Sequence, residues 1–202
     1  MKIGPKYKIA RRLGAPVFEK TQTPKYALSL SRKERAGTGG RGKPKSEFGT
    51  ELIEKQKARF TYGLGERQFR NYVEKSLHAK EPVQKLFTLL ESRLDNALAR
   101  SGFTKTRAQA RQAASHGHIT VNGKRVTVPS IELRVGDTIG IRAGSSASAL
   151  FADVAERMKA VTVPAWLEVD PENRTATVKG QPVYVPQEHV FDLRVSIEFY
   201  NR

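Results

Sequence analysis

The chain has no cysteine, which excludes disulfide bonds and thiolate metal sites. Its four histidines are scattered, and His116 and His118 lie near each other without further ligand residues nearby. No apolar run approaches the length that spans a bilayer, and Met1-Lys-Ile-Gly-Pro lacks the apolar core of a signal peptide. We therefore expect no metal, no cofactor and no membrane partner, and the absence of cysteine is consistent with a reducing, cytoplasmic compartment.

Acidic residues are also few. The sequence holds 36 Lys and Arg against 20 Asp and Glu, a net charge of +16, and its pI is near 10.2. Residues 1–150 carry 30 basic and 12 acidic side chains, while residues 151–202 carry 6 and 8, which gives +18 and −2. The expected partner is a polyanion, and the surface that binds it belongs to the first three-quarters of the chain.

Two helices are predicted in the middle of the chain. Gly102 is a natural end for the first, and the second begins at Thr104 or Thr106, continues through an alanine-rich stretch and stops at Gly117. Apolar residues of the first helix recur at intervals of three and four: Leu86, Leu89, Leu90, Leu94, Ala97 and Leu98. Pro82 suits the first turn of the helix that leads into this region.

A hairpin follows the second helix. Residues 118–121 and 124–128 flank Asn122-Gly123, a pair that readily takes positive φ at both centres of a type I′ turn. Almost no acidic residue lies between Thr104 and Ser130. Any single cation here suits a merely solvated surface equally well, but the whole set favours an anion-binding surface.

This helix-turn-helix and hairpin closely resembles the small RNA-binding module named after the S-four ribosomal protein. In that module the second helix and the following hairpin touch RNA. Further motifs in the same order are similar to the bacterial small-subunit ribosomal protein S-four family: Ile3-Gly-Pro, Arg11-Arg12, Glu54-Lys-Gln-Lys57, residues 62–71, Leu90-Glu-Ser-Arg-Leu-Asp-Asn96, Gln109-Ala-Arg-Gln112, residues 116–123 and Ile197-Glu-Phe-Tyr-Asn-Arg202. Where some members carry the cysteines of a zinc knot, this chain has Tyr7, Ala10 and Tyr26, as expected of a metal-free branch.

The resemblance implies a structural constituent of the small ribosomal subunit rather than an enzyme. Such a protein binds small-subunit ribosomal RNA early at a multi-helix junction, nucleates assembly of the subunit body and influences translational accuracy. It also implies contact with ribosomal protein S-five and a place near the mRNA entry. The residues predicted to bind RNA are Arg11, Arg12, Lys55, Arg59, Arg67, Arg70, Lys105, Arg107, Gln109, Arg111, Gln112, His116, His118, Asn122, Lys124 and Arg125.

The main alternative is an RNA-modifying enzyme. Pseudouridine synthases often carry the same module and use an Arg-Leu-Asp motif with a catalytic Asp, as in Arg93-Leu-Asp95. In those enzymes the motif lies in a separate catalytic domain, whereas here it lies inside the RNA-binding module. Residues 37–42 are glycine-rich but lack the Gly-Lys-Ser/Thr ending of a phosphate loop.

The predicted fold class is α+β, with a helical N-terminal lobe, a basic arm, and an RNA-binding module of helix-turn-helix and small antiparallel β-sheet. The expected segments are a largely extended arm over 1–46, a helical lobe over 47–92 and the module over 93–202, with the option that the last residues pack back on the lobe. Helices are predicted at 48–62, 66–77 and 150–158. Strands are predicted within 130–141 as a pair, as a hairpin of 166–169 with 175–178, and over 193–200, where apolar and polar residues alternate.

Overall fold

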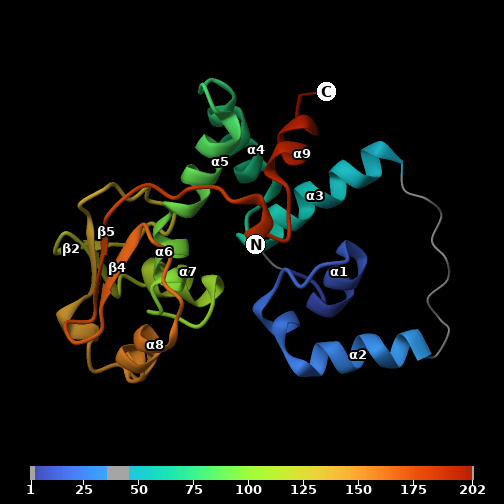
Figure 1. The fold of residues 1–202 in the computed structure, drawn as a ribbon. Helices are drawn as coiled ribbons and strands as arrows, with labels where there is room; N and C mark the ends of the chain where they lie inside the picture. The colour runs from blue at the N-terminus through green and yellow to red at the C-terminus, as the bar shows by residue number, and fades with distance from the viewer. Residues whose placement is uncertain (1–2, 36–45, 202) are drawn as a thin grey trace. The chain divides into compact units, whose positions relative to one another are not determined.

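The computed structural model of the chain describes residues 3–35 and 46–201 (Figure 1). These residues form two compact units. The first comprises the described parts of 1–83 and 185–202, and the second comprises 84–184. The chain thus leaves the first unit after residue 83 and returns to it at residue 185. Residues 185–202, at the end of the predicted segment 93–202, belong to the first unit.

The N-terminal arm is helical in its described part. It contains α1 (Lys6–Leu13), the 3-10 helix η1 (Glu19–Gln22) and α2 (Pro24–Arg35). The prediction of an extended arm is wrong for these stretches, and residues 36–45 lie outside the described residues. The arm folds because its few apolar residues converge, with Ile53 and Phe60 of the next helix packed against them. The buried members of this cluster are Ala10, Leu13, Ala15, Val17, Phe18 and Tyr26.

Two predicted helices complete the lobe. They are α3 (Glu47–Thr61) and α4 (Glu66–Leu77), and both predictions are confirmed. The hydroxyl of Ser46 accepts a hydrogen bond of 3.2 Å from the N–H of Gly49, which caps α3. After the 3-10 helix η4 (Pro186–Glu188), α9 (Leu193–Glu198) packs beside α3 in the same unit.

The strand predicted over 193–200 is therefore wrong. The alternation of apolar and polar residues suits a strand, but Leu193, Ser196 and Ile197 are the buried positions, at the spacing of a helix. Asp192 caps this helix by accepting a hydrogen bond of 2.7 Å from the N–H of Arg194. The contacts with α3 and this cap outweigh a weak local preference.

The second unit contains an antiparallel five-stranded sheet of order β2-β1-β3-β5-β4. Its strands are β1 (Ile119–Val121), β2 (Lys124–Val126), β3 (Thr138–Ile141), β4 (Leu167–Asp170) and β5 (Thr175–Val178). The two predicted hairpins, β1–β2 and β4–β5, are confirmed. Of the strand pair predicted within 130–141, only the second half forms a strand.

The first half of the segment 130–141 interrupts the long helix that the sequence predicts between Pro82 and Gly102. Residue Glu132 forms an isolated antiparallel bridge with Arg93, where the N–H of Leu94 donates to the Ile131 carbonyl at 2.9 Å and that of Leu133 donates to the Ser92 carbonyl at 2.8 Å. The backbone around residues 92–94 thus hydrogen-bonds to residues 131–133 instead of continuing the helical hydrogen bonds. The continuous helix predicted through this region is therefore wrong. Two helices form instead, α5 (Pro82–Glu91) and α6 (Leu94–Arg100).

The core of the second unit lies on one face of the sheet. The helices α6, α7 (Arg107–Ser115) and α8 (Val154–Ala160) cover this face, as Figure 1 shows for α6 and α7. Short 3-10 helices, η2 (Ala143–Ser145) and η3 (Ala149–Phe151), precede α8. Ile119, Ile139 and Ala176 point into the core, so the opposite face carries the alternate residues, among them Thr120 and Thr175.

Candidate nucleic-acid interface

The start of α7 is fixed by a cap. Thr106 accepts a hydrogen bond of 3.1 Å from the N–H of Gln109, which confirms it as the capping residue. The Gln109 side chain in turn accepts one of 2.9 Å from the N–H of Lys105. Lys105 is exposed beside the positive end of the helix dipole, so this end of α7 is suited to an anion.

Two arginines of α7 are held by polar residues of α6. Arg107 Nε donates to Asn96 Oδ1 at 2.7 Å, and Arg111 Nε and Nη2 donate to Asp95 Oδ2 at 2.9 and 2.7 Å. The Arg111 side chain keeps 29% of its exposure. Both guanidinium groups are therefore oriented by the fold and remain partly accessible, so each can act as a preorganised contact for phosphate.

Asp95 is the centre of this arrangement. Its side chain is 2% exposed, and Arg93 Nε and Nη2 donate to its two oxygens at 2.9 and 2.8 Å. A buried carboxylate bound by two arginines serves to position them. It cannot reach a base, so the catalytic role considered for Arg93-Leu-Asp95 has no support in this geometry.

A second buried carboxylate, Glu91, connects α5 to α6, and it was not among the predicted functional residues. Asn96 Nδ2 donates to both the carbonyl and Oε2 of Glu91, each at 2.9 Å, and Arg100 Nε and Nη2 donate to the Glu91 carboxylate at 3.1 and 3.0 Å. The available signal was position: Glu91 and Asn96 lie among core-facing leucines, where a polar residue must find a partner.

The predicted turn of the β1–β2 hairpin is confirmed. Asn122 has φ 51° and Gly123 has φ 76°. The Asn122 side chain lies against the start of β3, where its Nδ2 donates to Asp137 Oδ1 at 2.7 Å and its Oδ1 accepts from the N–H of Thr138 at 2.9 Å. Asn122 thus positions the hairpin, while Lys124 and Arg125 on β2 are exposed.

Residues at the end of α7 complete this surface. Gly117 has φ 71°, and a Cβ there would collide with the guanidinium of Arg125, which lies against the helix end. His116 is exposed, whereas His118 pairs through Nδ1 with Ser145 Oγ at 3.0 Å and packs edge-on against Phe151. We define the module surface as the exposed residues Lys105, Gln112, His116, Lys124 and Arg125 with the partly exposed Arg107 and Arg111.

In the first unit, Lys55 has a structural role. Its side chain is 5% exposed, its Nζ lies 2.6 Å from Glu66 Oε1, and it lies 4.3 Å from the ring centre of Phe199. Tyr200 donates its hydroxyl to the same Glu66 oxygen at 2.6 Å. Arg59 is 14% exposed and lies 3.5 Å from Glu66 Oε2. Lys55 and Arg59 are thus largely buried with partners inside the protein, and their contact with RNA stays a prediction.

These contacts shift two titrations. Burial and the hydrogen bond to Glu66 raise the pKa of Tyr200 above its ordinary value. Burial alone would raise the pKa of Glu66, but the hydrogen bonds from Lys55 and Tyr200 outweigh it and lower that pKa overall. The cluster therefore favours an ionised Glu66 and a neutral Tyr200.

The remaining predicted cations of this unit are exposed. Arg11 and Arg12 end α1, and Arg67 and Arg70 lie on α4. Arg70 Nε pairs with Glu74 at 2.9 Å between two exposed side chains, which contributes little. All four are accessible to an anionic partner.

The described residues lack both a metal-binding cluster and a membrane-spanning helix. Residues 3–35 and 46–201 contain no group of three or more His, Asp or Glu side chains placed to hold a metal ion. Among the helices of this same part of the chain, none has the length and apolar character needed to cross a membrane.

Two protein-family models match the sequence. Residues 1–92 match the model described as "Ribosomal protein S4/S9 N-terminal domain" and residues 92–139 match the "S4 domain". Together they cover the arm, the helical lobe, α6, α7 and the first hairpin.

Several curated proteins similar to this chain carry the description "Small ribosomal subunit protein uS4". The chain is 40% identical to that of Roseiflexus castenholzii over 99% of its own length and 98% of the relative's. It is 39% identical to that of Heliobacterium modesticaldum, with 98% of both chains covered. With the protein of a Sulfurihydrogenibium species the identity is 40%, over 98% of this chain and 95% of the other.

Proposed function

This chain belongs to the uS4 family of small ribosomal subunit proteins, and from that premise we propose that it binds small-subunit ribosomal RNA early and nucleates assembly of the subunit body. Its role is structural, within the small subunit, rather than enzymatic. The observation that carries the proposal is the module surface, in which Arg111 is oriented by buried Asp95, Arg107 by buried Asn96, and the hairpin by the Asn122 turn.

The contact is made mainly with phosphates. The module surface presents guanidinium and ammonium groups from one helix and one hairpin, and it includes no acidic side chain. Such a surface recognises the shape and backbone of folded RNA rather than a base sequence. Arg11, Arg12, Arg67 and Arg70 supply further cations from the first unit, so that one protein engages several RNA segments.

Finer roles belong to the same proposal. They are an influence on translational accuracy, contact with ribosomal protein S-five and a position near the mRNA entry. Each of these three roles follows from the family resemblance.

The nucleating role can be tested by reconstitution. If this protein nucleates assembly, subunits reconstituted without it should have reduced occupancy of other body proteins. Normal assembly without it would contradict the nucleating role.

Filter binding to small-subunit ribosomal RNA across a salt series tests the interface. Replacing Lys105 and Lys124 with Ala removes two exposed cations, so the slope of log affinity against log salt should become shallower by about 1–2. The matched control replaces Lys159 and Lys179, two exposed lysines of the same unit that lie outside the module surface. An equal change in both double variants would indicate nonspecific attraction.

A further inference from the structure

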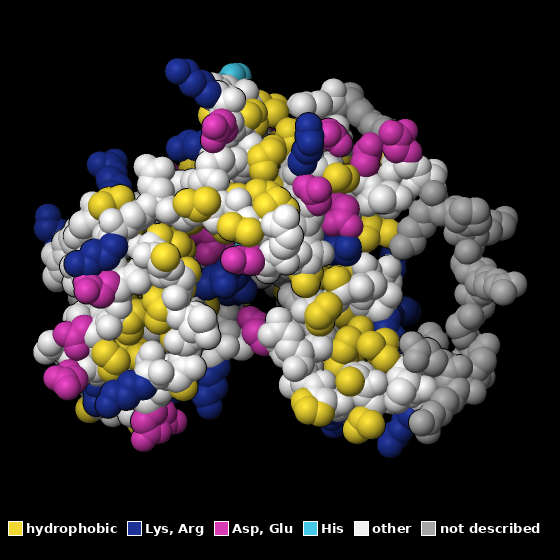
Figure 2. Space-filling model, viewed as in Figure 1, with side chains coloured by type: hydrophobic (Ala, Val, Ile, Leu, Met, Phe, Trp, Pro, Cys, Tyr) yellow, Lys and Arg dark blue, Asp and Glu magenta, His cyan; other side chains and the backbone are white. Residues whose placement is uncertain are grey.

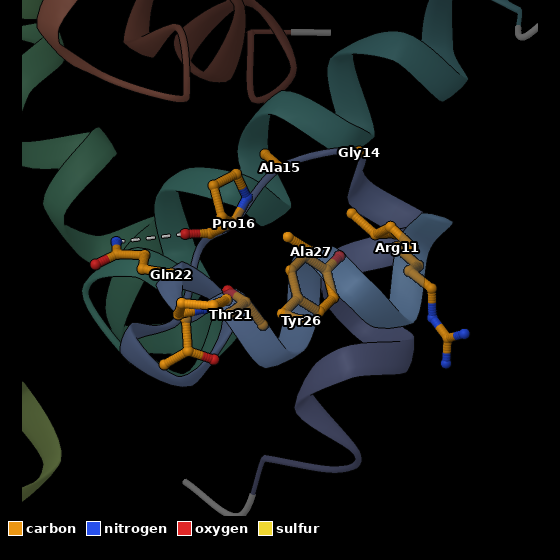
Figure 3. Close-up of a pocket in the computed structure, with 11 residues that line it drawn as sticks. Arg11, Gly14, Ala15, Pro16, Thr21, Gln22, Tyr26 and Ala27 are labelled. Carbon is orange, nitrogen blue, oxygen red and sulfur yellow. Dashed lines mark hydrogen bonds between the residues drawn. The ribbon is translucent and has the colours of Figure 1, made fainter. Parts of the chain in front are cut away.

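The N-terminal arm contains a groove that the module surface does not include. The groove has a volume of about 760 Å³ and lies wholly within the first unit. One wall is the turn after α1, where Gly14 (φ 69°) reverses the chain, and the other is α2 (Figure 3). Its volume falls within the roughly 300–1,000 Å³ of typical small-molecule sites.

The lining is mostly apolar, with polar groups in a few places. Walls are formed by Ala15, Pro16, Pro24, Tyr26, Ala27 and Leu30. Gln22 and Thr23 lie in the lining, and the Gln22 amide donates to the Pro16 carbonyl across 3.5 Å, the outer limit of a hydrogen bond. A ligand with its own acceptor can therefore replace that weak contact.

The surroundings are strongly cationic. Glu19 is the only acidic residue between positions 3 and 32. Within the described residues, no carboxylate lies within ion-pair distance of Arg11, Arg12 or Lys25. Figure 2 shows hydrophobic side chains gathered over α1 and α2 with Lys and Arg beside them. The exposed cations of residues 3–32 are Lys8, Arg11, Arg12, Lys20, Lys25 and Arg32.

This combination selects one class of occupant. An apolar segment of another protein would match the walls but not the cations, whereas a phosphate alone would match the cations but not the walls. A nucleotide matches both, because its base is flat and apolar on its faces, with polar edges, and its phosphate is anionic. Arg11 lines the groove and carries its charge out to solvent (Figure 3).

We propose that the groove receives one unstacked base of small-subunit ribosomal RNA while Arg11 binds an adjacent phosphate. This site rests on the proposed function and deepens it. The base lies against the ring of Tyr26, and the Gln22 amide turns to the base edge. Junctions and loops supply unstacked bases, whereas a continuous duplex supplies none, so the groove distinguishes folded RNA from a plain helix.

Filling the groove tests the proposal in the full-length protein. Ala27→Trp places a large ring in the groove, and Leu28→Trp places the same ring on the neighbouring position of α2, whose side chain is 60% exposed and does not line the groove. The first variant should lose about 5- to 100-fold in RNA affinity with an unchanged salt slope, since a stacking contact is lost and no charge is removed. The second should bind like the parent, and equal affinities of the two variants would overturn the proposal.

A second measurement needs no variant. In the free protein, adenosine monophosphate at millimolar concentration should shift the methyl resonances of Ala15, Ala27 and Leu30, and ribose 5-phosphate should not. Equal shifts with both compounds, or none with either, would refute the base pocket. Failure of the parent protein to bind ribosomal RNA would instead refute the proposed function, and the nucleotide titration separates these two results.

Discussion

Asp95 is a buried carboxylate bound by Arg93 and Arg111, and its removal should be costly. Asp95→Ala leaves the guanidinium of Arg93, 3% exposed, beside a cavity without its counter-charge, so we expect a loss of about 3–5 kcal/mol in the free energy of unfolding. Asp153→Ala is the control, because Asp153 is 66% exposed and lies 4.0 Å from Arg157, and it should cost at most about 1 kcal/mol. Denaturant titration measures both. Similar losses would mean that the buried network contributes no more than a surface pair.

Asn122 combines a left-handed backbone with two side-chain hydrogen bonds. Asn122→Gly keeps the backbone conformation and should cost about 1 kcal/mol for the lost bonds to Asp137 and Thr138. Asn122→Val loses the same bonds and adds strain at φ 51°, so its cost should be about 2–3 kcal/mol. Thermal unfolding of the two variants separates strain from bonding. If valine cost no more than glycine, strain would contribute nothing.

At the scale of single residues, the predictions that are confirmed are those that depend only on neighbouring residues. Thr106, Gly117 and Asn122-Gly123 could be identified because a cap and a left-handed turn depend on nearest neighbours. The burial of Lys55 could not, because its partners Glu66, Phe199 and Tyr200 are distant in the sequence. A basic residue on a helix resembles a phosphate contact until the packing around it is known.

The element α9 is secured by the cluster of Lys55, Glu66 and Tyr200, and that makes its stability depend on pH. The raised pKa of Tyr200 favours the neutral phenol, so its contribution is full below about pH 10, the ordinary pKa, and is lost as the pH rises further. The lowered pKa of Glu66 gives a contribution present above its ordinary 4.5 and lost as the pH falls through the folded-state value.

Tyr200→Phe should therefore abolish this part of the alkaline loss and move the pKa of Glu66 upward, because one hydrogen bond to the carboxylate disappears. Unfolding free energies measured from pH 5 to 11 test the first effect, and a carboxylate titration followed by NMR tests the second. An unchanged Glu66 pKa would show that Lys55 alone controls this carboxylate.

Elements were predictable where the local apolar pattern and the turn residues decided them, as in α3, α4 and the two hairpins. They were not where distant backbone decided the outcome. The helix through 92–93 breaks because residues 131–133 pair with it, and the arm folds because Ile53 and Phe60 complete its small core. Tyr7 and Tyr26, two positions at which the resemblance implied a metal-free arm, pack against each other with ring centres 5.1 Å apart.

At the scale of the whole molecule, the first unit is discontinuous. A chain that ends at Tyr184 keeps every residue of the second unit but lacks α9 and the aromatic partners of Lys55. Its amides in β1, β3 and β5 should exchange as slowly as in the full chain, while those in α3 and α4 should exchange faster. Faster exchange throughout would show that the two units unfold together.

The position of α9 in the sequence also affects the order in which the two units can fold during synthesis. A polypeptide emerges from its amino end, so α1 to α4 are available long before residues 185–202, with all of residues 84–184 made in between. Domains generally fold as units during synthesis, which allows the later-made unit to become native first. Helix α3 is therefore synthesised well before α9 can pack against it, and the first unit is completed only after residues 84–184 have been made.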